Sequence, residues 1–361
     1  MQIAIVGLPY SGKTTFFQTL TETQFDQHAL QRREANIATV KVQDKRLDEF
    51  TEIFQPKKKV NATIEIVDLV GVQKGEKAGS MFNTAFLTKV RTNDALIHVV
   101  RAFEDESIPH VEGSINVLRD IKIFEDELLF ADLAFIEGRL EKLEREMGKQ
   151  KTKEQVTKEK EVMLKWNETL EKGIPLRERE IHDDEILLLK NYQPLTSKPL
   201  LIAVNFDERD ISKADGIIET LRQNIKGKKI RIEPFFAKIE RELVSLEEEE
   251  KKMFMEEYGI KESALSRLIR SAYRLLGLQS FFTVGEDECR AWTIHEGDNA
   301  QEAAGTIHTD FFNKFIRAEV THYEDFMKYK NFAKCKEHGV FRLEGKEYIV
   351  KDGDILHVRH G

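Results

Sequence analysis

Eight residues near the N-terminus decide most of what this chain can fold into. Residues 7–14, Gly-Leu-Pro-Tyr-Ser-Gly-Lys-Thr, match the pattern G-x-x-x-x-G-K-[ST] in full. The apolar residues 3–6 before them predict a buried parallel strand, and residues 15–20 after them predict the start of a helix. A chance match would lack this flanking strand and helix. The order predicts an α/β fold of the P-loop NTPase type built on a parallel sheet.

Each residue type in this loop has a chemical reason. Glycines let backbone N–H groups wrap a phosphate, and a lysine reaches the terminal phosphates of a nucleotide. The hydroxyl of Thr14 suits Mg²⁺, and the positive end of the following helix faces the anion. The residues that we expect to bind nucleotide here are Pro9, Tyr10, Ser11, Gly12, Lys13, Thr14 and Thr15.

A second apolar run, residues 62–67, predicts another strand and ends in Asp68-Leu69-Val70-Gly71. In P-loop NTPases an acid at the end of such a strand holds Mg²⁺, and a following glycine can offer its N–H to the γ-phosphate. By itself D-x-x-G is a weak pattern that often marks only a turn. Its place after a buried strand favours a functional role, so we expect Lys13, Asp68 and Gly71 to act in catalysis. We expect Thr14 and Asp68 to be the metal ligands.

Two further apolar runs, residues 95–100 and 200–204, predict the next strands of the sheet. The second leads into Asn205-Phe206-Asp207-Glu208, where GTPases of this class carry N-K-x-D. Because the aspartate of that motif accepts two hydrogen bonds from guanine, Glu208 weakens the case for guanine specificity. We expect Asn205 and Glu208 to lie at the base of the nucleotide, the alternative being a plain polar loop.

Charge and cysteine content exclude several classes of protein. Lys and Arg number 56 against 64 Asp and Glu, a formal net charge of −8, so indiscriminate coating of nucleic acid or anionic membrane is not expected. We likewise expect no sequence-specific binding to DNA. Two cysteines, Cys289 and Cys335, are too few for a disulfide framework or a cysteine zinc site. The N-terminus resembles neither a secretion signal nor a membrane span, which favours the cytoplasm.

The chain is long enough for two or three domains, and residues 126–192 differ in pattern from their surroundings. Apolar residues there alternate spacings of four and three, as in a coiled-coil seam, and a second run returns after a break at residues 148–151. This pattern predicts an antiparallel helical hairpin that interrupts the nucleotide domain. Its charged face is either a binding surface or simply solvated. The seam residues are Leu129, Leu133, Ile136, Leu140, Leu143 and Met147, answered by Val156, Met163, Trp166 and Leu170.

Composition changes again at about residue 278. Residues 281–284 and 290–293 predict a hairpin, residues 298–308 a short helix, and later short strands complete a ββαββ order typical of a β-grasp fold. From residue 278 onward there are 11 Lys or Arg against 15 Asp or Glu, so any contact with RNA must come from a local patch. A solvated rim is the other interpretation. The candidates for a patch are Arg317, Lys328, Lys330, Lys334 and Lys336.

Together these motifs resemble one family closely, the Obg-like ATPases of the YchF type, within the translation-factor class of P-loop GTPases. The resemblance extends over essentially the whole chain, and its C-terminal block is too long to be accidental. The motifs that carry it are Gly12-Lys13-Thr14-Thr15, Val67-Asp68-Leu69-Val70-Gly71, His98-Val99-Val100-Arg101, Asn205-x-x-Glu208, Arg290-Ala291-Trp292-Thr293, Ile307-His308-Thr309-Asp310-Phe311, Tyr323-Glu324-Asp325-Phe326 and Asp352-Gly353-Asp354.

The resemblance implies a division and a function. It implies a nucleotide-binding domain of residues 1–125 and 193–277, a coiled-coil hairpin of residues 126–192 and a TGS domain of the β-grasp type at residues 278–361. Because N-x-x-E replaces N-K-x-D in that family, it implies binding of ATP at least as well as GTP, with Mg²⁺. It also implies slow hydrolysis in a nucleotide-dependent switch that acts on the ribosome or RNA.

This chain departs from the family pattern in two places. The family loop usually has Asn, Val and Ser where Tyr10, Ser11 and Thr14 stand, and threonine keeps the hydroxyl for Mg²⁺. An alignment anchored on Asn36 and residues 44–48 places Arg32 where the family has the threonine that closes over Mg²⁺; Thr39 is near but in another register. Val72 follows the family instead, whose members carry a hydrophobic residue where Ras-like enzymes have the water-orienting glutamine, and Gln73 comes one place late.

These departures leave two other functions open. A nucleotide-binding scaffold that has lost hydrolysis would explain Arg32. A small-molecule kinase would use Lys13 and Thr14 equally well, but it needs a lid with arginines, and no such segment is evident in the sequence.

Overall fold

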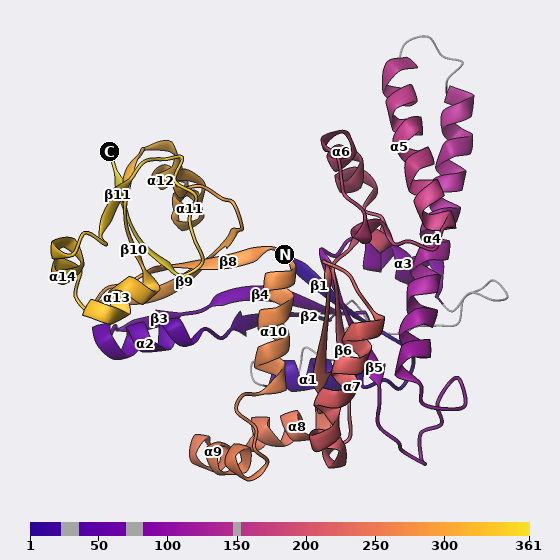
Figure 1. Ribbon diagram of the computed structural model, residues 1–361, viewed down its shortest axis with the longest axis horizontal. Helices are drawn as coiled ribbons and strands as arrows, with labels where there is room; N and C mark the ends of the chain where they lie inside the picture. The colour runs from indigo at the N-terminus through magenta and orange to yellow at the C-terminus, as the bar shows by residue number, and fades with distance from the viewer. Residues whose placement is uncertain (23–35, 70–81, 147–152) are drawn as a thin grey trace. The chain divides into compact units, whose positions relative to one another are not determined.

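The chain is divided into two compact units (Figure 1). The computed structural model describes residues 1–22, 36–69, 82–146 and 153–361. Unit 1 comprises Met1–Ala38 and Glu65–Leu268, and unit 2 comprises Thr39–Ile64 and Ile269–Gly361. The boundaries fall within β2 (Asn36–Val42), β4 (Ala62–Asp68) and α10 (Ala264–Leu275). Each unit has a sheet and a core of its own.

The sheet of unit 1 has the strand order β2-β4-β1-β5-β6-β7. Strand β1 pairs in parallel with β4 on one side and β5 on the other, and β5, β6 and β7 continue in parallel. The predicted strands are therefore present, while β2 and β7 were not predicted. The remaining bounds are β1 (Gln2–Val6), β5 (Ala95–Arg101), β6 (Leu200–Asn205) and β7 (Ile230–Phe235).

Most strand residues in unit 1 are fully buried, as expected for a parallel sheet covered on both faces. The helices that follow the strands supply the apolar partners of the core, for example Phe86 of α3 and Phe124 of α4. The helices of unit 1 besides those of the hairpin include α1 (Lys13–Glu22), α3 (Thr84–Arg91), α7 (Ile211–Asn224), α8 (Ala237–Ser245) and α9 (Glu248–Glu257), with the short turn η4 (Glu208–Asp210) after β6.

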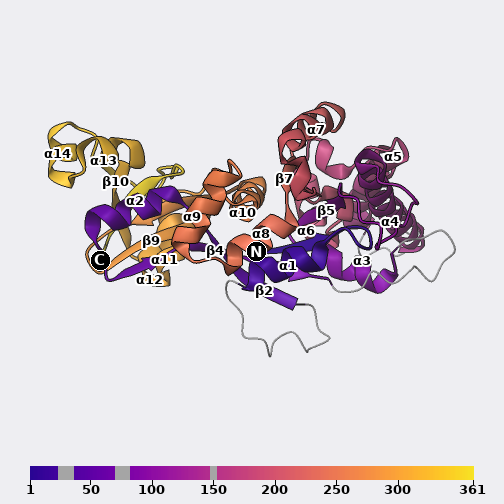
Figure 2. The same ribbon diagram turned by 90° about the horizontal axis from the view of Figure 1, so that it is seen from below.

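Two long helices, α4 (Val117–Glu146) and α5 (Lys153–Glu171), lie side by side and form the predicted hairpin (Figures 1 and 2). Every seam residue from Leu129 to Leu143 belongs to one apolar cluster with Val156, Met163, Trp166 and Leu170, which confirms the seam. Helix α4 begins nine residues before the expected boundary, because its first turns pack Ile121 and Phe124 into the core of unit 1. Met147 and residues 148–151 lie outside the described residues.

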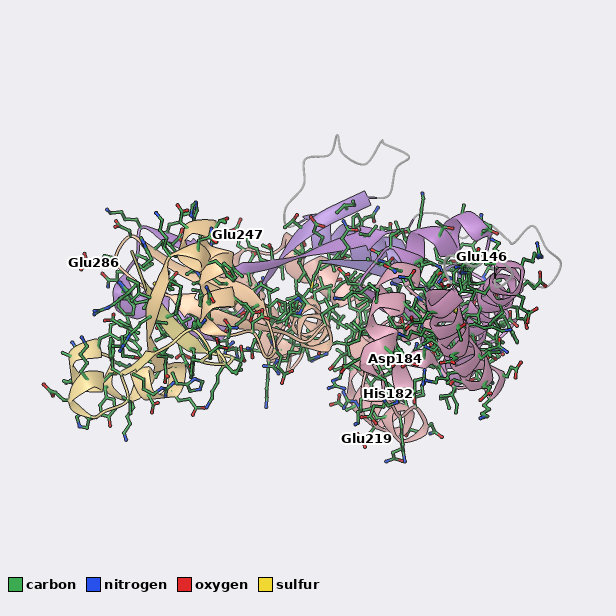
Figure 3. The ribbon with its side chains drawn as sticks, turned by 90° about the horizontal axis from the view of Figure 1, so that it is seen from above. Glu146, His182, Asp184, Glu219, Glu247 and Glu286 are labelled. Atoms are coloured by element: carbon green, nitrogen blue, oxygen red, sulfur yellow. The ribbon has the colours of Figure 1, made fainter. Side chains whose placement is uncertain are left out.

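The base of the hairpin is held by a buried carboxylate. Asp132 of α4 is fully buried and accepts hydrogen bonds from the backbone N–H groups of Leu195 (3.0 Å) and Thr196 (2.8 Å). Arg91 of α3 pairs with the same carboxylate at 3.1 Å. Glu146, by contrast, marks the far end of α4, and Asp184 stands at the start of α6 (Asp183–Tyr192), both on the surface (Figure 3).

Unit 2 contains the expected ββαββ order, with three short helices added. Its sheet has the order β11-β10-β12-β8-β9-β3, and Phe281, Val320 and Leu356 lie in its core. The strands are β8 (Leu278–Thr283), β9 (Glu288–His295), β10 (Phe315–His322), β11 (Arg342–Glu344) and β12 (Asp354–His360). The helices are α11 (Ala300–Ile307), α12 (Thr309–Asn313), α13 (Tyr323–Tyr329) and α14 (Phe332–Glu337).

Residues 39–64 belong to unit 2, although they were expected in the nucleotide domain. Strand β3 (Lys58–Val60) pairs in parallel with β9, and α2 (Lys45–Phe54) packs Phe50 edge-to-face on Phe282, with ring centroids 5.2 Å apart. Arg46 of α2 pairs with Asp44 at 2.7 Å and Asp352 at 3.0 Å. The contacts of this segment thus differ from the expected division, and the functional roles of the three expected parts stay predictions.

No helix in the described parts of the chain is long and apolar enough to cross a membrane.

Candidate functional site

The polar residues singled out in the sequence meet at one edge of the sheet in unit 1. Because β1, β4 and β6 belong to a parallel sheet, their carboxyl ends lie at the same edge. The P-loop follows β1, Asp68 ends β4 and Asn205 ends β6. Ligands of open α/β sheets bind at this edge, where the connections of neighbouring strands diverge.

The two glycines of the loop are required by its backbone. Gly7 has φ +142°, and a Cβ there would lie 2.4 Å from the carbonyl oxygen of Val99. Gly12 has φ +101°, and its Cβ would lie 2.3 Å from Nδ2 of Asn205. Both values are well inside the shortest distance that real Cβ atoms keep, so no side chain fits at either position.

Tyr10 adopts φ +63°, a left-handed conformation that is uncommon for a residue with a large side chain. Tyr10 is 62% exposed, so burial of its ring offsets little of this strain. Backbone strain of this kind gathers at ligand-binding loops. Pro9 and Thr15 are half-buried in the same segment, and Thr14 is exposed at the start of α1.

Lys13 and Asp68 form the electrostatic centre of the site. The ammonium of Lys13 donates a 2.7 Å hydrogen bond to the carbonyl oxygen of Leu8. Burial lowers the pKa of Lys13 to about 8, partly opposed by the charge of Asp68. Burial likewise raises the pKa of Asp68 to about 6, partly opposed by Lys13. Two groups that lose hydration without gaining hydrogen bonds to other side chains have capacity left for a ligand.

Asn205 ties the loop to the rest of the site. Its side chain is buried; Nδ2 donates to the carbonyl oxygen of Ser11 at 3.1 Å, and Oδ1 accepts from the backbone N–H of Ala237 at 3.2 Å. Asn205 therefore positions the P-loop and the start of α8. Its expected contact with the base stays a prediction.

Glu208 lines an open cleft of about 530 Å³ together with Lys238, Arg241, Glu242 and Ser245. Next to the cleft, buried Asp207 accepts a 2.7 Å hydrogen bond from Nε of Arg209, and Nζ of Lys238 lies 3.6 Å from its other oxygen. Lys238 and Arg241 were not singled out in the sequence. The signal was present, since residues 230–235 alternate in the manner of a strand and are followed at once by Phe236-Ala237-Lys238.

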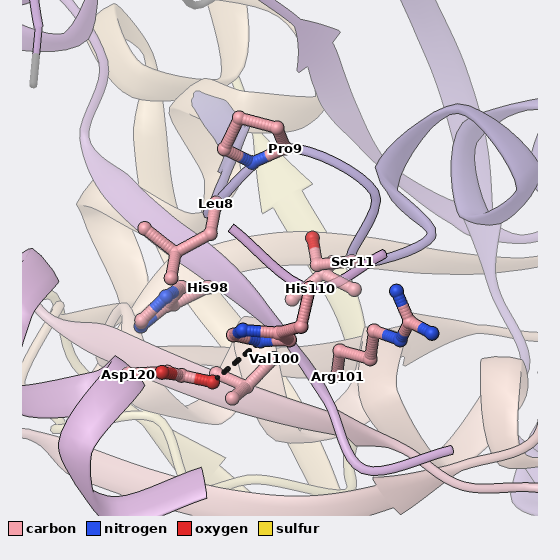
Figure 4. Close-up of a pocket in the computed structure, with 9 residues that line it drawn as sticks. Leu8, Pro9, Ser11, His98, Val100, Arg101, His110 and Asp120 are labelled. Carbon is pink, nitrogen blue, oxygen red and sulfur yellow. Dashed lines mark ion pairs between the residues drawn. The ribbon is translucent and has the colours of Figure 1, made fainter. Parts of the chain in front are cut away.

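Behind the P-loop lies a small polar pocket that the sequence did not suggest (Figure 4). Leu8, Ser11, His98, Arg101, His110 and Asp120 line it. Nε2 of His110 lies 3.0 Å from a carboxylate oxygen of Asp120, and His98 stacks on Phe124 with ring centroids 4.2 Å apart.

His98 is fully buried in this pocket, and neither of its ring nitrogens has a hydrogen-bond partner among the described residues. Burial, followed by the charge of Lys13, lowers the pKa of His98 to about 3. The ring is therefore neutral at physiological pH and adds no competing positive charge behind the loop.

Several expected residues lie outside the described residues: Gly71, Arg32, Val72 and Gln73. Thr39 is described and lies in β2 with its side chain exposed. Within the described part of the chain no three His, Cys, Asp or Glu residues gather in a way that could hold a metal.

Comparison with known proteins supports the assignment of a P-loop nucleotide site to unit 1. Residues 2–124 match the family model MMR_HSR1, described as 50S ribosome-binding GTPase, and residues 278–361 match YchF-GTPase_C, described as a protein of unknown function (DUF933). The chain is 41% identical over 359 residues to the "Ribosome-binding ATPase YchF" of Bacillus subtilis, covering 98% of each chain. It is 37% identical to "Obg-like ATPase 1" of Caenorhabditis elegans, covering 99% of this chain and 91% of the relative.

A solved structure agrees with the whole fold. The YchF GTPase of Schizosaccharomyces pombe superposes with a TM-score of 0.85 at 34% identity, covering 99% of this chain and 97% of the other. The fold agrees with these matches, since the P-loop, Asp68 and Asn205 lie at one edge of the sheet and the inserted hairpin and the C-terminal block are both present. The chain belongs to the YchF family of Obg-like P-loop NTPases.

Proposed function

We propose that this chain binds a purine nucleoside triphosphate with Mg²⁺ at the P-loop, hydrolyses it slowly and works as a nucleotide-dependent switch on the ribosome. The observation that supports this most is the electrostatic coupling of half-buried Lys13 to buried Asp68, beside a loop in which Gly7 and Gly12 take positive φ angles. Relatives named ribosome-binding ATPases align with the chain over nearly its full length.

The phosphates would lie over the loop between β1 and α1. There the backbone N–H groups from Gly7 to Lys13 and the positive end of α1 attract negative charge. A phosphate oxygen near Lys13 would take over from the carbonyl oxygen of Leu8 as the acceptor of its ammonium. The bound anion would also raise the pKa of Lys13 toward its usual range.

Thr14 and Asp68 are the residues that would hold Mg²⁺. Asp68 fits this role because it is a buried carboxylate that forms no hydrogen bond with other described residues, and a cation would offset its lost hydration. Few protein ligands are needed, since Mg²⁺ keeps several waters and binds phosphate oxygens in such sites. When bound, the ion would neutralise charge that develops on the phosphates.

The base would extend toward the cleft at Glu208. Glu208 replaces the aspartate that reads guanine, and Lys238 and Arg241 line the same cleft. We propose that ATP binds at least as well as GTP, with Glu208 setting the preference and Asn205 acting mainly by positioning the loop. The hairpin and the C-terminal block, which includes Arg317 and Lys328, would supply the contacts with ribosome or RNA.

Nucleotide titration and phosphate release test the proposal together. Purified protein should bind ATP with Mg²⁺ in a calorimetric titration and release phosphate slowly, faster with ribosomes present. Binding without any release, with or without ribosomes, would establish the scaffold alternative. Phosphate transfer to a small acceptor in place of water would establish a kinase. Absence of nucleotide binding would overturn the assignment of the P-loop.

Single-turnover release separates the possible closing residues. If Arg32 stands where a threonine is needed, Thr39→Ala should leave Mg²⁺-dependent release unchanged. If Thr39→Ala abolishes release while Arg32→Ala is silent, the register of that segment is wrong and Thr39 is the closing residue. Gln73→Ala completes the set, and a loss of release there would identify it as the residue that orients water.

A further inference from the structure

The sheet of unit 2 is open along part of β12. This strand pairs with β10 over its whole length, from Asp354 to His360, but with β8 only through Ile355 and Phe282. Strand β8 ends at Thr283, one residue later. The outer edge of residues 356–360 therefore has no strand partner in the described parts of the chain. Leu356 is buried, whereas residues 357–360 are exposed or half-buried.

A slot of about 610 Å³ runs beside this edge. Ile355 and His357 line it from one face of the sheet, and Leu356 and Val358 line it from the other. Since neighbouring residues of a strand point to opposite faces, a cavity that touches both sets lies along the strand and not over one face. Its volume is within the roughly 300–1,000 Å³ usual for ligand sites.

The other walls of the slot are aromatic. Trp292 of β9, Phe311 of α12 and Phe341 after α14 line it, each half-buried and so partly open to a ligand. His360 already stacks on Phe311, with ring centroids 4.3 Å apart. Such walls suit a side chain that projects from a chain lying against β12.

Charge around the slot distinguishes between possible occupants. Its two carboxylates are already paired, Glu319 with Arg359 and Glu288 with Lys58 and Arg290. Lys336 lies with Nζ 4.4 Å from the centre of the Phe341 ring and forms no ion pair with any described residue. One unpaired lysine is too little for a phosphate backbone, which binds through many cations, but it suits a single carboxylate.

We propose that this slot, the β12 edge slot, binds an extended peptide of a partner protein that pairs with residues 356–360 as an added strand. The peptide carries an apolar or aromatic side chain toward Trp292 and Phe311 and an acidic residue toward Lys336. Five residues of strand span ~17 Å, so a heptapeptide is long enough to cover the edge. The proposal does not depend on the nucleotide site of unit 1.

Fluorescence anisotropy with the full chain tests the proposal. The probe is a fluorescein-labelled heptapeptide of alternating valine and threonine, with phenylalanine at the centre and glutamate at one end. Two matched peptides carry N-methyl groups on one or the other alternate set of amides. Strand pairing predicts that one methylated peptide loses at least about tenfold in affinity while the other binds as the parent does, because only alternate amides face the edge.

Variants locate the binding. Lys336→Glu should weaken the parent peptide about tenfold, whereas Lys346→Glu, an exposed lysine that does not line the slot, should leave it unchanged. Thermal melting of both variants checks that unit 2 is still folded. No saturable binding of the parent peptide, or equal binding of all three peptides, overturns the proposal. Tighter, Lys336-dependent binding of a single-stranded oligouridylate would also overturn it and make the slot a nucleic-acid site.

Discussion

The nucleotide site of unit 1 and the polar network of unit 2 differ in how their buried polar groups are hydrogen-bonded. In unit 1, Asp68 has no hydrogen-bond donor among the described residues, and both ring nitrogens of His98 are without partners. In unit 2, fully buried Asp354 accepts from the hydroxyl of Tyr348 (2.8 Å) and the backbone N–H of Lys351 (2.9 Å), and Nδ1 of His322 lies 3.1 Å away. Buried polar groups without partners are typical of ligand sites, while buried polar groups with partners stabilise the fold.

The largest expected effect is a loss of ATP affinity at the nucleotide site of unit 1. Lys13→Ala should weaken ATP binding at least about a hundredfold, ~2.7 kcal/mol, because it removes the only lysine of the loop. The melting temperature should not fall, since among the described residues the ammonium donates to a single acceptor, the carbonyl oxygen of Leu8. Lys89→Ala, an exposed lysine of α3, is the matched control for calorimetry. Unchanged ATP affinity in Lys13→Ala would show that Lys13 and Asp68 do not form a nucleotide site.

A substitution in the polar network of unit 2 should lower the stability of the fold and leave nucleotide binding unchanged. Asp354→Ala removes the buried carboxylate that accepts from the hydroxyl of half-buried Tyr348 and from the N–H of Lys351, which should cost ~2 kcal/mol of unfolding free energy. Denaturant unfolding in a Trp166→Phe background, where Trp292 is the only tryptophan, measures this by fluorescence, with exposed Glu337→Ala as control. A variant as stable as the control would show that the network is not what holds unit 2.

A third prediction uses pH. Lys13 must be charged to bind phosphate and loses its proton above about pH 8, whereas Asp68 must be ionised to hold Mg²⁺ and gains a proton below about pH 6. Affinity for ATP with Mg²⁺ should therefore be greatest near pH 7 and fall about tenfold by pH 5. Asp68→Asn should bind weakly throughout and lose the acidic limb. A flat profile in the wild type between pH 5 and 9 contradicts these shifted pKa values.

The smallest effect is expected at the base. Glu208→Asp shortens the side chain by one methylene and restores the residue that reads guanine, so the ratio of GTP to ATP affinity should rise about three- to tenfold. Glu219→Asp, on the exposed side of α7, is the control. If wild-type protein already binds GTP more than tenfold better than ATP, Glu208 does not set the preference.

The sequence predicted features that depend on local pattern. The P-loop is a contiguous motif, and its glycines Gly7 and Gly12 have the positive φ angles that such a loop needs. The seam from Leu129 to Leu143 needs only helical periodicity, and it is confirmed by the burial of its residues. The placement of residues 39–64 in unit 2 depends on the pairing of β3 with β9 and on the contact of Phe50 with Phe282, more than two hundred residues away in the chain. No periodicity within a segment encodes its distant partner.

The pocket behind the P-loop escaped prediction for a related reason. His98 stands within the apolar run of β5, where it resembles one more strand residue, and only the pairing of β5 with β1 brings it against Gly7. The two hydrogen bonds of the Asn205 side chain could not be predicted from the sequence either. Its motif suggested contact with a base, whereas the fold turns both polar atoms of the side chain toward Ser11 and Ala237.

The membership of Thr39–Ile64 in unit 2 has a consequence for synthesis on the ribosome. Arg46 and its partner Asp352 are 306 residues apart in the chain. At ~5–20 residues per second, α2 emerges roughly 15–60 s before Asp352 exists, and during that time Phe50 and Phe54 lack the rings of Phe282 and Phe326 that cover them later. Unit 2 cannot be completed until translation is almost finished. A fragment that starts at Leu278 would meet the converse problem, because it would leave Phe282 and Phe326 uncovered permanently.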